Sequence, residues 1–365
     1  MKHYYETVEK VQELLQANPE WKSRYANYMV DLASLINANA VCEAQKKFSV
    51  PTLFQLYLPL SMAVRECSAA LIVFDLRFHG QSVASVYVDT QKDASVMLHI
   101  KEKKTVYKAL YTVEKNTDAE ALKKLADASN GVAAYDWHSP GAKAFRRIYA
   151  ELEAALTRKN LRLTGQPEHD MESWLLKNYA QTSSAQKEVS YMQPVTMLGS
   201  RVFFQMPTPI AASNVKKGVD QLTYSPRSRG GIDILARVGS GRSTTLAVLE
   251  LKDENKSSEA PEHVLCQAVA YATFLHALLR SDCGQQWWRF FGFGGTIPNA
   301  LKLKAAVVMP YRSNKGALEQ HTQAFMDSIQ RENIMQLPDT DDRIELGYIF
   351  RDAAGPDEEK IIKFF

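Results

Sequence analysis

The feature that most constrains the fold of this chain is a pair of short apolar runs joined by a polar turn. The runs are Gly231-Ile232-Asp233-Ile234-Leu235-Ala236 and Leu246-Ala247-Val248-Leu249-Glu250-Leu251-Lys252, with Gly239-Ser240-Gly241-Arg242 between them. Apolar runs on either side of a glycine-containing turn predict a β-hairpin. Each run also carries charge, which is costly to bury unless it is paired or holds a metal. We therefore expect these charged residues to form a functional site.

Three charged side chains of this hairpin are placed to meet. Successive side chains of a strand point to opposite faces, so Glu250 and Lys252 lie on one face. Asp233 comes from the preceding strand, across the turn. Other acid-x-lysine triplets occur in the chain, but only Glu250 and Lys252 end a strongly apolar run. The two acids and the lysine can therefore converge at one edge of a sheet and hold a divalent cation against a phosphate.

The segment after the hairpin predicts an alternation of helices and strands. We expect a helix over 261–280, a strand over 305–309, a helix near 316–331 and a strand over 344–350. A strand, a long helix and a second strand in this order favour two parallel strands that are neighbours in one sheet. The predicted fold class is therefore α/β.

The segment before the hairpin predicts a mixed α/β region. Expected helices and strands are, in chain order, helices 4–16 and 20–40, a β-meander over 69–78, 83–89 and 95–101, helices 118–129 and 140–158, a helix 171–179 capped by Asp170, and strands near 188–197 and 201–206. Thr164-Gly165-Gln166-Pro167 marks a boundary. We expect an N-terminal accessory domain over 1–165 and a second domain over 166–365, because 365 residues leave room for about two domains.

Composition limits the class of protein further. The net charge of +3 is close to neutral and leaves nucleic-acid binding open, because a local basic patch matters more than the total. The N-terminus is polar, and the apolar run 69–74 is too short to span a bilayer. The four cysteines are scattered and fit reduced thiols, so we expect a cytoplasmic protein. No GxxxxGK[ST] or GxSxG motif is present, which argues against a P-loop or an α/β-hydrolase.

The charged hairpin and its flanks resemble the PD-(D/E)XK nuclease superfamily, which includes restriction endonucleases and Holliday-junction resolvases. The resemblance rests on Asp233 followed by Glu250-Leu251-Lys252 and covers roughly residues 166–310. Glu172, on the helix before the strands, matches a glutamate that many members carry. Gln267-Ala268-Val269-Ala270-Tyr271 matches their Gln-x-x-x-Tyr. The proline of the family motif is absent, since Gly231-Ile232 precedes Asp233.

The resemblance implies a restriction-endonuclease-like core of helix, three strands, helix and strand, and a metal-dependent nuclease. Asp233 and Glu250 would bind Mg²⁺ or Mn²⁺, with the carbonyl of Leu251 as a further ligand, and Glu172 would reach the metal through water or help a second ion. Lys252 would orient the attacking water, and Gln267 would position the lysine or the water. The expected reaction is hydrolysis of a phosphodiester bond. By analogy with the family, we expect DNA as the substrate and a role in phage defence or repair.

Two surface features have a functional and an ordinary interpretation. Lys216, Lys217, Arg227 and Arg229 precede Asp233 and suit contact with a phosphate backbone, or else are solvated loop charges. The aromatic segment 287–293 offers a surface for stacking bases, or else belongs to the core or a partner interface. The alternative functions are a non-catalytic nucleic-acid-binding module and a protein-interaction scaffold. A homodimer or a protein partner bound through the N-terminal domain is compatible with each of these functions.

Overall fold

In the computed structural model the chain divides into two compact units. Unit 1 comprises residues 1–29, 175–197 and 205–365, and unit 2 comprises 30–174 and 198–204. This division follows contacts rather than chain order and so differs from the expected domains 1–165 and 166–365. The structure describes residues 1–37, 39–47, 50, 52–58, 70–91, 95–113, 117–130, 135–159, 161, 163, 167–181, 187, 189–197, 202–226, 230–252, 259–311, 317–353 and 359–364.

Unit 2 contains a six-stranded sheet with the order β5-β4-β3-β2-β1-β7. Its strands are β1 (Phe54–Tyr57), β2 (Leu71–Phe78), β3 (Gln81–Asp89), β4 (Val96–Ile100), β5 (Tyr135–Asp136) and β7 (Val202–Phe203). The strands β2, β3 and β4 are antiparallel neighbours, which confirms the meander predicted over residues 69–101. The strand predicted near 201–206 is β7, which pairs in parallel with β1 and so belongs to this sheet.

The helices of unit 2 begin where the sequence provides start signals. They are α3 (Ala40–Lys47), α5 (Lys104–Val113), α6 (Thr117–Asn130) and α7 (Pro140–Arg158), while α2 (Glu20–Asn37) and α8 (Pro167–Tyr179) contribute residues to both units. The Ser139 side chain accepts a hydrogen bond from the Ala142 amide and caps α7. Helix α8 begins at Pro167, so the prediction that Asp170 caps it is wrong.

The turn between β2 and β3 is tight and is held by two helices of the same unit. His79 and Gly80 both have positive φ, 46° and 72°, as a two-residue hairpin turn of the favoured twist requires. The His79 ring is hydrogen-bonded through Nδ1 to Asp170 of α8 and through Nε2 to Glu153 of α7. Burial opposes a charge on this ring, but the two carboxylates outweigh burial and raise the pKa of His79 to about 9. His79 is therefore an imidazolium at neutral pH.

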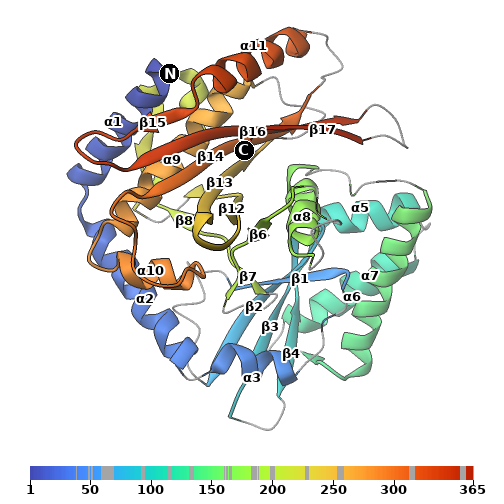
Figure 1. The fold of residues 1–365 in the computed structure, drawn as a ribbon. Helices are drawn as coiled ribbons and strands as arrows, with labels where there is room; N and C mark the ends of the chain where they lie inside the picture. The colour runs from blue at the N-terminus through green and yellow to red at the C-terminus, as the bar shows by residue number, and fades with distance from the viewer. Residues whose placement is uncertain are drawn as a thin grey trace. The chain divides into compact units, whose positions relative to one another are not determined.

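Unit 1 contains a seven-stranded mixed sheet with the order β15-β16-β14-β13-β12-β6, and β17 pairs with β16 (Figure 1). Its strands are β6 (Met192–Pro194), β12 (Ile234–Val238), β13 (Thr245–Leu251), β14 (Lys302–Pro310), β15 (Ile334–Gln336), β16 (Arg343–Ala353) and β17 (Glu359–Phe364). The strands β6, β12 and β13 are antiparallel neighbours, and β14 runs parallel to β13. The predicted parallel pair on either side of a helix is therefore confirmed.

Two short strand pairs complete unit 1. They are β8 (Pro207–Thr208) with β11 (Gly230–Gly231), and β9 (Ile210–Ala211) with β10 (Thr223–Tyr224). Three short 3₁₀ turns lie in the same region: η3 (Val215–Lys217), η4 (Val219–Gln221) and η5 (Gly241–Ser243).

The connecting helix α9 (Pro261–Leu279) forms the centre of the core of unit 1. Almost all its side chains are buried, because it contacts β13 and β14 on one side and α1 (Lys2–Ala17) on another (Figure 1). The other helices of this unit are α10 (Gly284–Phe290) and α11 (Ala317–Arg331). No single helix in the described ranges is long and apolar enough to cross a membrane, and the pair α9 and α10, which together reach that length and composition, is bent by 117°.

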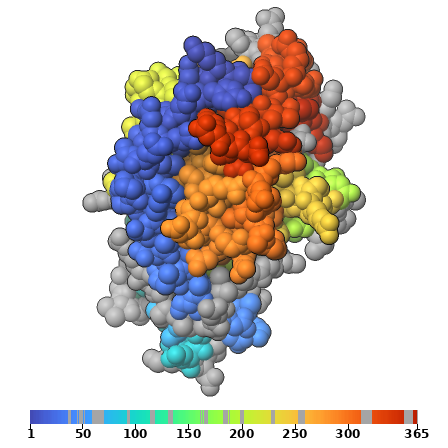
Figure 2. All heavy atoms as spheres, turned by 60° about the vertical axis from the view of Figure 1, so that its left-hand side comes forward, coloured from blue at the N-terminus to red at the C-terminus, as the bar shows by residue number. Residues whose placement is uncertain are grey.

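The aromatic segment 287–293 contributes to this core. Trp287 and Phe291 are fully buried, and the Trp287 indole donates a 3.2 Å hydrogen bond to the backbone of Tyr25 in α2. The Tyr25 ring also packs against Phe274 of α9. Figure 2 shows the first helices (blue) beside the surface around residues 280–300 (orange). The interpretation of Trp287 and Phe291 as core residues is confirmed, and neither presents a surface for bases.

Candidate functional site

The two acidic residues of the hairpin lie opposite each other at its open end. Ile234 of β12 pairs with Leu249 of β13 in the antiparallel register. One residue further along each strand, Asp233 and Glu250 are therefore cross-strand neighbours. Glu250 is buried, with 4% of its surface exposed, and Asp233 is half-buried. The convergence that alternation and the turn predicted for these two acids is present in the fold.

A main-chain hydrogen bond holds Asp233 in this position. Its Oδ2 accepts from the backbone amide of Leu251 at 2.9 Å. Leu251 was expected to offer its carbonyl to a metal, and the structure assigns its amide to Asp233. The bond fixes one carboxylate oxygen of Asp233 at the end of β13.

The lysine of the motif pairs with the glutamate two residues before it. Lys252 Nζ lies 3.4 Å from Glu250 Oε1, and the two side chains are only 16% and 6% exposed. The backbone amide of Lys252 donates to the Val308 carbonyl at 3.0 Å. The parallel ladder with β14 thus continues past the last residue of β13 and positions the lysine beside the acids.

Helix α9 brings two further predicted residues to this region. Tyr271 is buried, and its burial, followed by the negative charges of Glu250 and Asp233, raises the pKa of its phenol, which therefore stays protonated at any physiological pH. Gln267, one helical turn earlier, is 1% exposed and donates from Nε2 to Glu259 Oε1 at 3.1 Å. Gln267 was expected to position Lys252 or a water molecule, but the contact that the structure shows is with Glu259.

Glu259 is a residue that sequence reasoning missed. It lies two residues before α9 and is half-buried. Its sequence signal is weak, because an acid just before a helix is favoured by the helix dipole whatever its function. Its contact with Gln267 became visible only in the fold.

Glu172 lies in unit 2, and the contacts that the structure gives for it are within that unit. Its Oε2 is 3.5 Å from His169 Nδ1. Its Oε1 is buried and accepts no hydrogen bond from the described residues. Burial, with the Glu172 carboxylate as the next contribution, raises the pKa of Tyr57. The neighbours that the structure gives Glu172 are therefore His169 and Tyr57, which the motif did not predict.

The basic residues before the hairpin are only partly described. Lys216 and Lys217 are exposed on η3, a turn that contacts α9. Arg227 and Arg229 lie outside the described residues. Two exposed lysines beside α9 are compatible with phosphate contact and equally with a solvated turn.

The donor chemistry of the hairpin end fits a hard divalent cation. Asp233 and Glu250 supply carboxylate oxygens from adjacent positions, and Mg²⁺ is commonly held by one or two carboxylates, with water and substrate phosphate as the other ligands. No group of three or more His, Cys, Asp and Glu side chains within the described ranges is arranged to hold a metal. A dedicated all-protein metal cage is therefore not part of the described structure.

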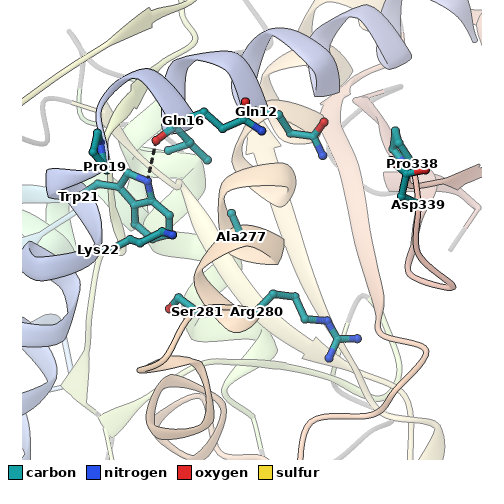
Figure 3. Close-up of a pocket in the computed structure, with 11 residues that line it drawn as sticks. Gln12, Gln16, Pro19, Trp21, Lys22, Ala277, Arg280, Ser281, Pro338 and Asp339 are labelled. Atoms are coloured by element: carbon teal, nitrogen blue, oxygen red, sulfur yellow. Dashed lines mark hydrogen bonds between the residues drawn. The ribbon is translucent and has the colours of Figure 1, made fainter.

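A hollow of 510 Å³ lies elsewhere in unit 1, between the α1–α2 turn, the end of α9 and the turn before β16 (Figure 3). Lys22 and Arg280 are the cationic residues among those that line this hollow. Arg280 donates to Asp342 from Nε at 2.8 Å and from Nη2 at 2.5 Å. Burial opposes the charge of Asp342, but Arg280, the Leu301 amide and His276 outweigh it and lower the pKa of Asp342 to about 2. The Arg280 charge is therefore already paired with the carboxylate of Asp342.

Comparison with models of known protein families, with curated proteins and with solved structures finds no match for this chain. Functional inference therefore rests on the geometry of the hairpin end.

Proposed function

We propose that the open end of the β12–β13 hairpin is the active site of a metal-dependent nuclease that hydrolyses phosphodiester bonds, with DNA as the preferred substrate. The observation that carries this proposal is the opposition of Asp233 and Glu250 on paired strands, with Lys252 Nζ 3.4 Å from Glu250 Oε1. Two buried or half-buried acids side by side repel each other unless a cation compensates them. Carboxylate oxygens from two adjacent positions are ligands that Mg²⁺ prefers, and Lys252 is ion-paired with one of the two acids.

The arrangement of elements around the acids gives separate support. After helix α8, the sheet of unit 1 contains β6, β12 and β13, then helix α9 and β14 in chain order, with β7–β11 inserted between β6 and β12. This order is compatible with the restriction-endonuclease-like core. Asp233 directly precedes the second of these strands, Glu250 and Lys252 lie at the end of the third, and Tyr271 approaches from α9. Each of these positions is compatible with the PD-(D/E)XK resemblance.

The residues of the site have separable roles in the proposed reaction. Asp233 and Glu250 hold the cation, with the Leu251 carbonyl as a third oxygen donor. Mg²⁺ or Mn²⁺, when bound, polarises the scissile phosphate and lowers the pKa of a coordinated water. Lys252 orients the attacking water or stabilises the negative charge that develops on the phosphoryl oxygens. Tyr271 remains a neutral hydrogen-bond donor at the edge of the site, and Gln267 holds Glu259 in place. Glu172 is not used.

The first experiment is a cleavage assay with the purified protein. Supercoiled plasmid, linear duplex, single-stranded DNA and RNA would be incubated with Mg²⁺, Mn²⁺ or EDTA. We expect cleavage with a metal ion, none with EDTA, and loss of cleavage in Lys252→Ala. A matched control is Lys304→Ala, because Lys304 forms a 3.3 Å ion pair with Glu345 on the same sheet without belonging to the site.

Equal loss of activity in Lys252→Ala and Lys304→Ala would assign the effect to general destabilisation and contradict the proposal. If the wild-type protein binds nucleic acid but cleaves none of the substrates with either metal ion, the non-catalytic binding module would be favoured instead. Thermal unfolding of both variants would be measured alongside, so that a folding defect is recognised.

A further inference from the structure

A second polar pocket lies at the turn end of the β12–β13 hairpin, the end opposite to Asp233 and Glu250. Its volume is 330 Å³. It is lined by Lys187, Tyr191, Gln193, Arg237, Thr244 and the turn Gly239–Gly241. With strands rising about 3.3 Å per residue, Arg237 and Gly239 of the pocket lie roughly 13 and 20 Å along the strand from Asp233. The pocket is therefore separate from the proposed catalytic site.

The guanidinium of Arg237 is held in this pocket by neutral groups. Its Nη1 donates to the Gly292 carbonyl at 2.8 Å, and its Nη2 donates to Gln193 Oε1 at 3.0 Å. Its Nε is buried and has no hydrogen-bond partner in the described part of the chain. Burial lowers the pKa of Arg237. The side chain is thus oriented in advance, and the partners that the described residues give it are neutral.

The second cation of the pocket, Lys187, is also held by a neutral group. Lys187 Nζ donates to the Met192 carbonyl at 2.9 Å, and burial lowers the pKa of Lys187. The described lining residues include no aspartate or glutamate. Two half-buried cations that share a pocket without a carboxylate create a site that favours an anion.

The turn adds uncharged donors to the two cations. Gly239 and Gly241 have positive φ, 111° and 55°, and a side chain at Gly239 would approach the Ser243 carbonyl to 2.8 Å. Ser240, between them, is exposed, and its amide donates to no backbone carbonyl of the described residues. A glycine turn that exposes an amide beside an arginine is the kind of concavity that receives phosphate oxygens.

We propose that this pocket binds a phosphate group, which Arg237 and Lys187 contact from two sides while the Gly239–Gly241 turn supplies backbone donors. The phosphate belongs either to a free phosphorylated molecule or to a nucleic-acid backbone. In the second case the contact falls about four to six base pairs from the proposed catalytic site, at 3.4 Å per base pair. The proposal does not depend on catalysis at Asp233 and Glu250.

Binding would be measured by calorimetry and by thermal unfolding in EDTA, so that no metal-dependent reaction contributes. The probes are inorganic phosphate, adenosine 5′-monophosphate with adenosine as its phosphate-free control, and a short DNA duplex, all at constant ionic strength. We expect phosphate and the nucleotide to bind and to raise the unfolding temperature, and adenosine to do neither. Tighter binding of the duplex than of the nucleotide would identify the backbone as the source, and the reverse would identify a free ligand.

The variants Arg237→Gln and Lys187→Gln should each weaken phosphate binding by about tenfold or more, as expected for loss of a hydrogen bond to a charged group. Arg289→Gln, which removes an exposed guanidinium of unit 1, should bind like the wild type. Asp233→Asn should also retain binding, which separates this proposal from the nuclease proposal. The proposal is overturned if the wild-type protein binds none of the phosphate probes, or if Arg289→Gln loses as much affinity as the two pocket variants.

Discussion

The Oδ2 atom of Asp233 accepts a 2.9 Å hydrogen bond from the backbone amide of Leu251, the residue that follows Glu250. This bond joins β12 and β13 at their open end and holds the Asp233 carboxylate beside that of Glu250. Two carboxylates at opposed positions are unfavourable for folding, because like charges directly opposite each other repel. Lys252 offsets part of this repulsion through its 3.4 Å ion pair with Glu250, and a bound cation would offset more.

Replacing Asp233 should therefore separate stability from activity. Asp233→Asn keeps an oxygen that accepts from the Leu251 amide and removes one of the repelling charges, so we expect stability at least equal to the wild type. Asp233→Ala loses the hydrogen bond and should be less stable by about 1 kcal/mol. Both variants should lose about a hundredfold or more in cleavage rate. Chemical unfolding and a plasmid cleavage assay check the two effects.

A stability of Asp233→Asn clearly below that of the wild type would show that the charge itself holds the hairpin together. That result would contradict the view that the two acids repel and await a cation.

The hairpin and its acids could be predicted because the determining signals are local. Apolar alternation fixes the faces of β13, and the glycine turn fixes which residues of β12 oppose them. The helix α9 was equally predictable, since Pro261 marks its start and its length suits a crossover between parallel strands. These features need no knowledge of the rest of the chain.

The features that the sequence left open depend on contacts between distant segments. Nothing near Trp287 indicates that its indole meets Tyr25, more than 200 residues earlier. Likewise, the motif predicts that Gln267 positions Lys252. The observed partner of Gln267 is Glu259, which lies in a charged stretch where acids are common. Asp170 is a residue type that often caps helices, but the helix begins earlier, at Pro167, and the Asp170 carboxylate is hydrogen-bonded to His79. Local patterns cannot distinguish such alternatives.

The turn glycine Gly80 should be intolerant of a side chain. Its φ is 72°, and a Cβ there would lie 2.3 Å from the His169 carbonyl oxygen of α8. Gly80→Ala should therefore lower the free energy of unfolding by more than the roughly 1 kcal/mol that a left-handed alanine costs. The measurement is thermal or urea unfolding of the purified variant.

The matched control for this prediction is Gly295→Ala. Gly295 has the same φ of 72°, but nothing lies within 4 Å of a Cβ placed there. The difference between the two variants isolates the contact with α8. Equal destabilisation would show that the backbone conformation alone matters and that the turn does not press on the helix.

The charge on His79 should stabilise unit 2 in a defined pH range. Its pKa is about 9 in the folded protein, against 6.5 for an unperturbed histidine, so the contribution is complete below pH 6.5 and disappears as the pH rises through about 9. The shift corresponds to at most about 3 kcal/mol. Unfolding measured from pH 6 to pH 10 should show a decline that His79→Asn lacks, and asparagine tolerates the positive φ of this position.

The comparison with His79→Asn also removes the effect of other titrating groups, such as His169, whose pKa is raised by its hydrogen bond to Glu172. A parallel decline in the wild type and the variant would assign the pH dependence to those groups. The curves should instead approach each other above pH 9, where His79 is neutral.

The buried carboxylate of Asp342 should be the most sensitive polar residue of unit 1. It is 1% exposed and accepts from Arg280, from His276 and, at 2.6 Å, from the Leu301 amide. Asp342→Ala leaves these donors buried together and should cost about 3–5 kcal/mol. Asp342→Asn should cost less, because its amide oxygen still accepts from Leu301.

The pH dependence of the same residue has the opposite sign to that of His79. The pKa of Asp342 is lowered from 3.8 to about 2, so its charge stabilises the folded protein above pH 3.8, and this contribution disappears as the pH falls through about 2. The difference in stability between the wild type and Asp342→Asn should be constant from pH 5 to pH 7 and should narrow below pH 4. Urea unfolding over that range provides the measurement. A difference that stays constant below pH 4 would mean that Asp342 acts through its shape and hydrogen bonds rather than through its charge.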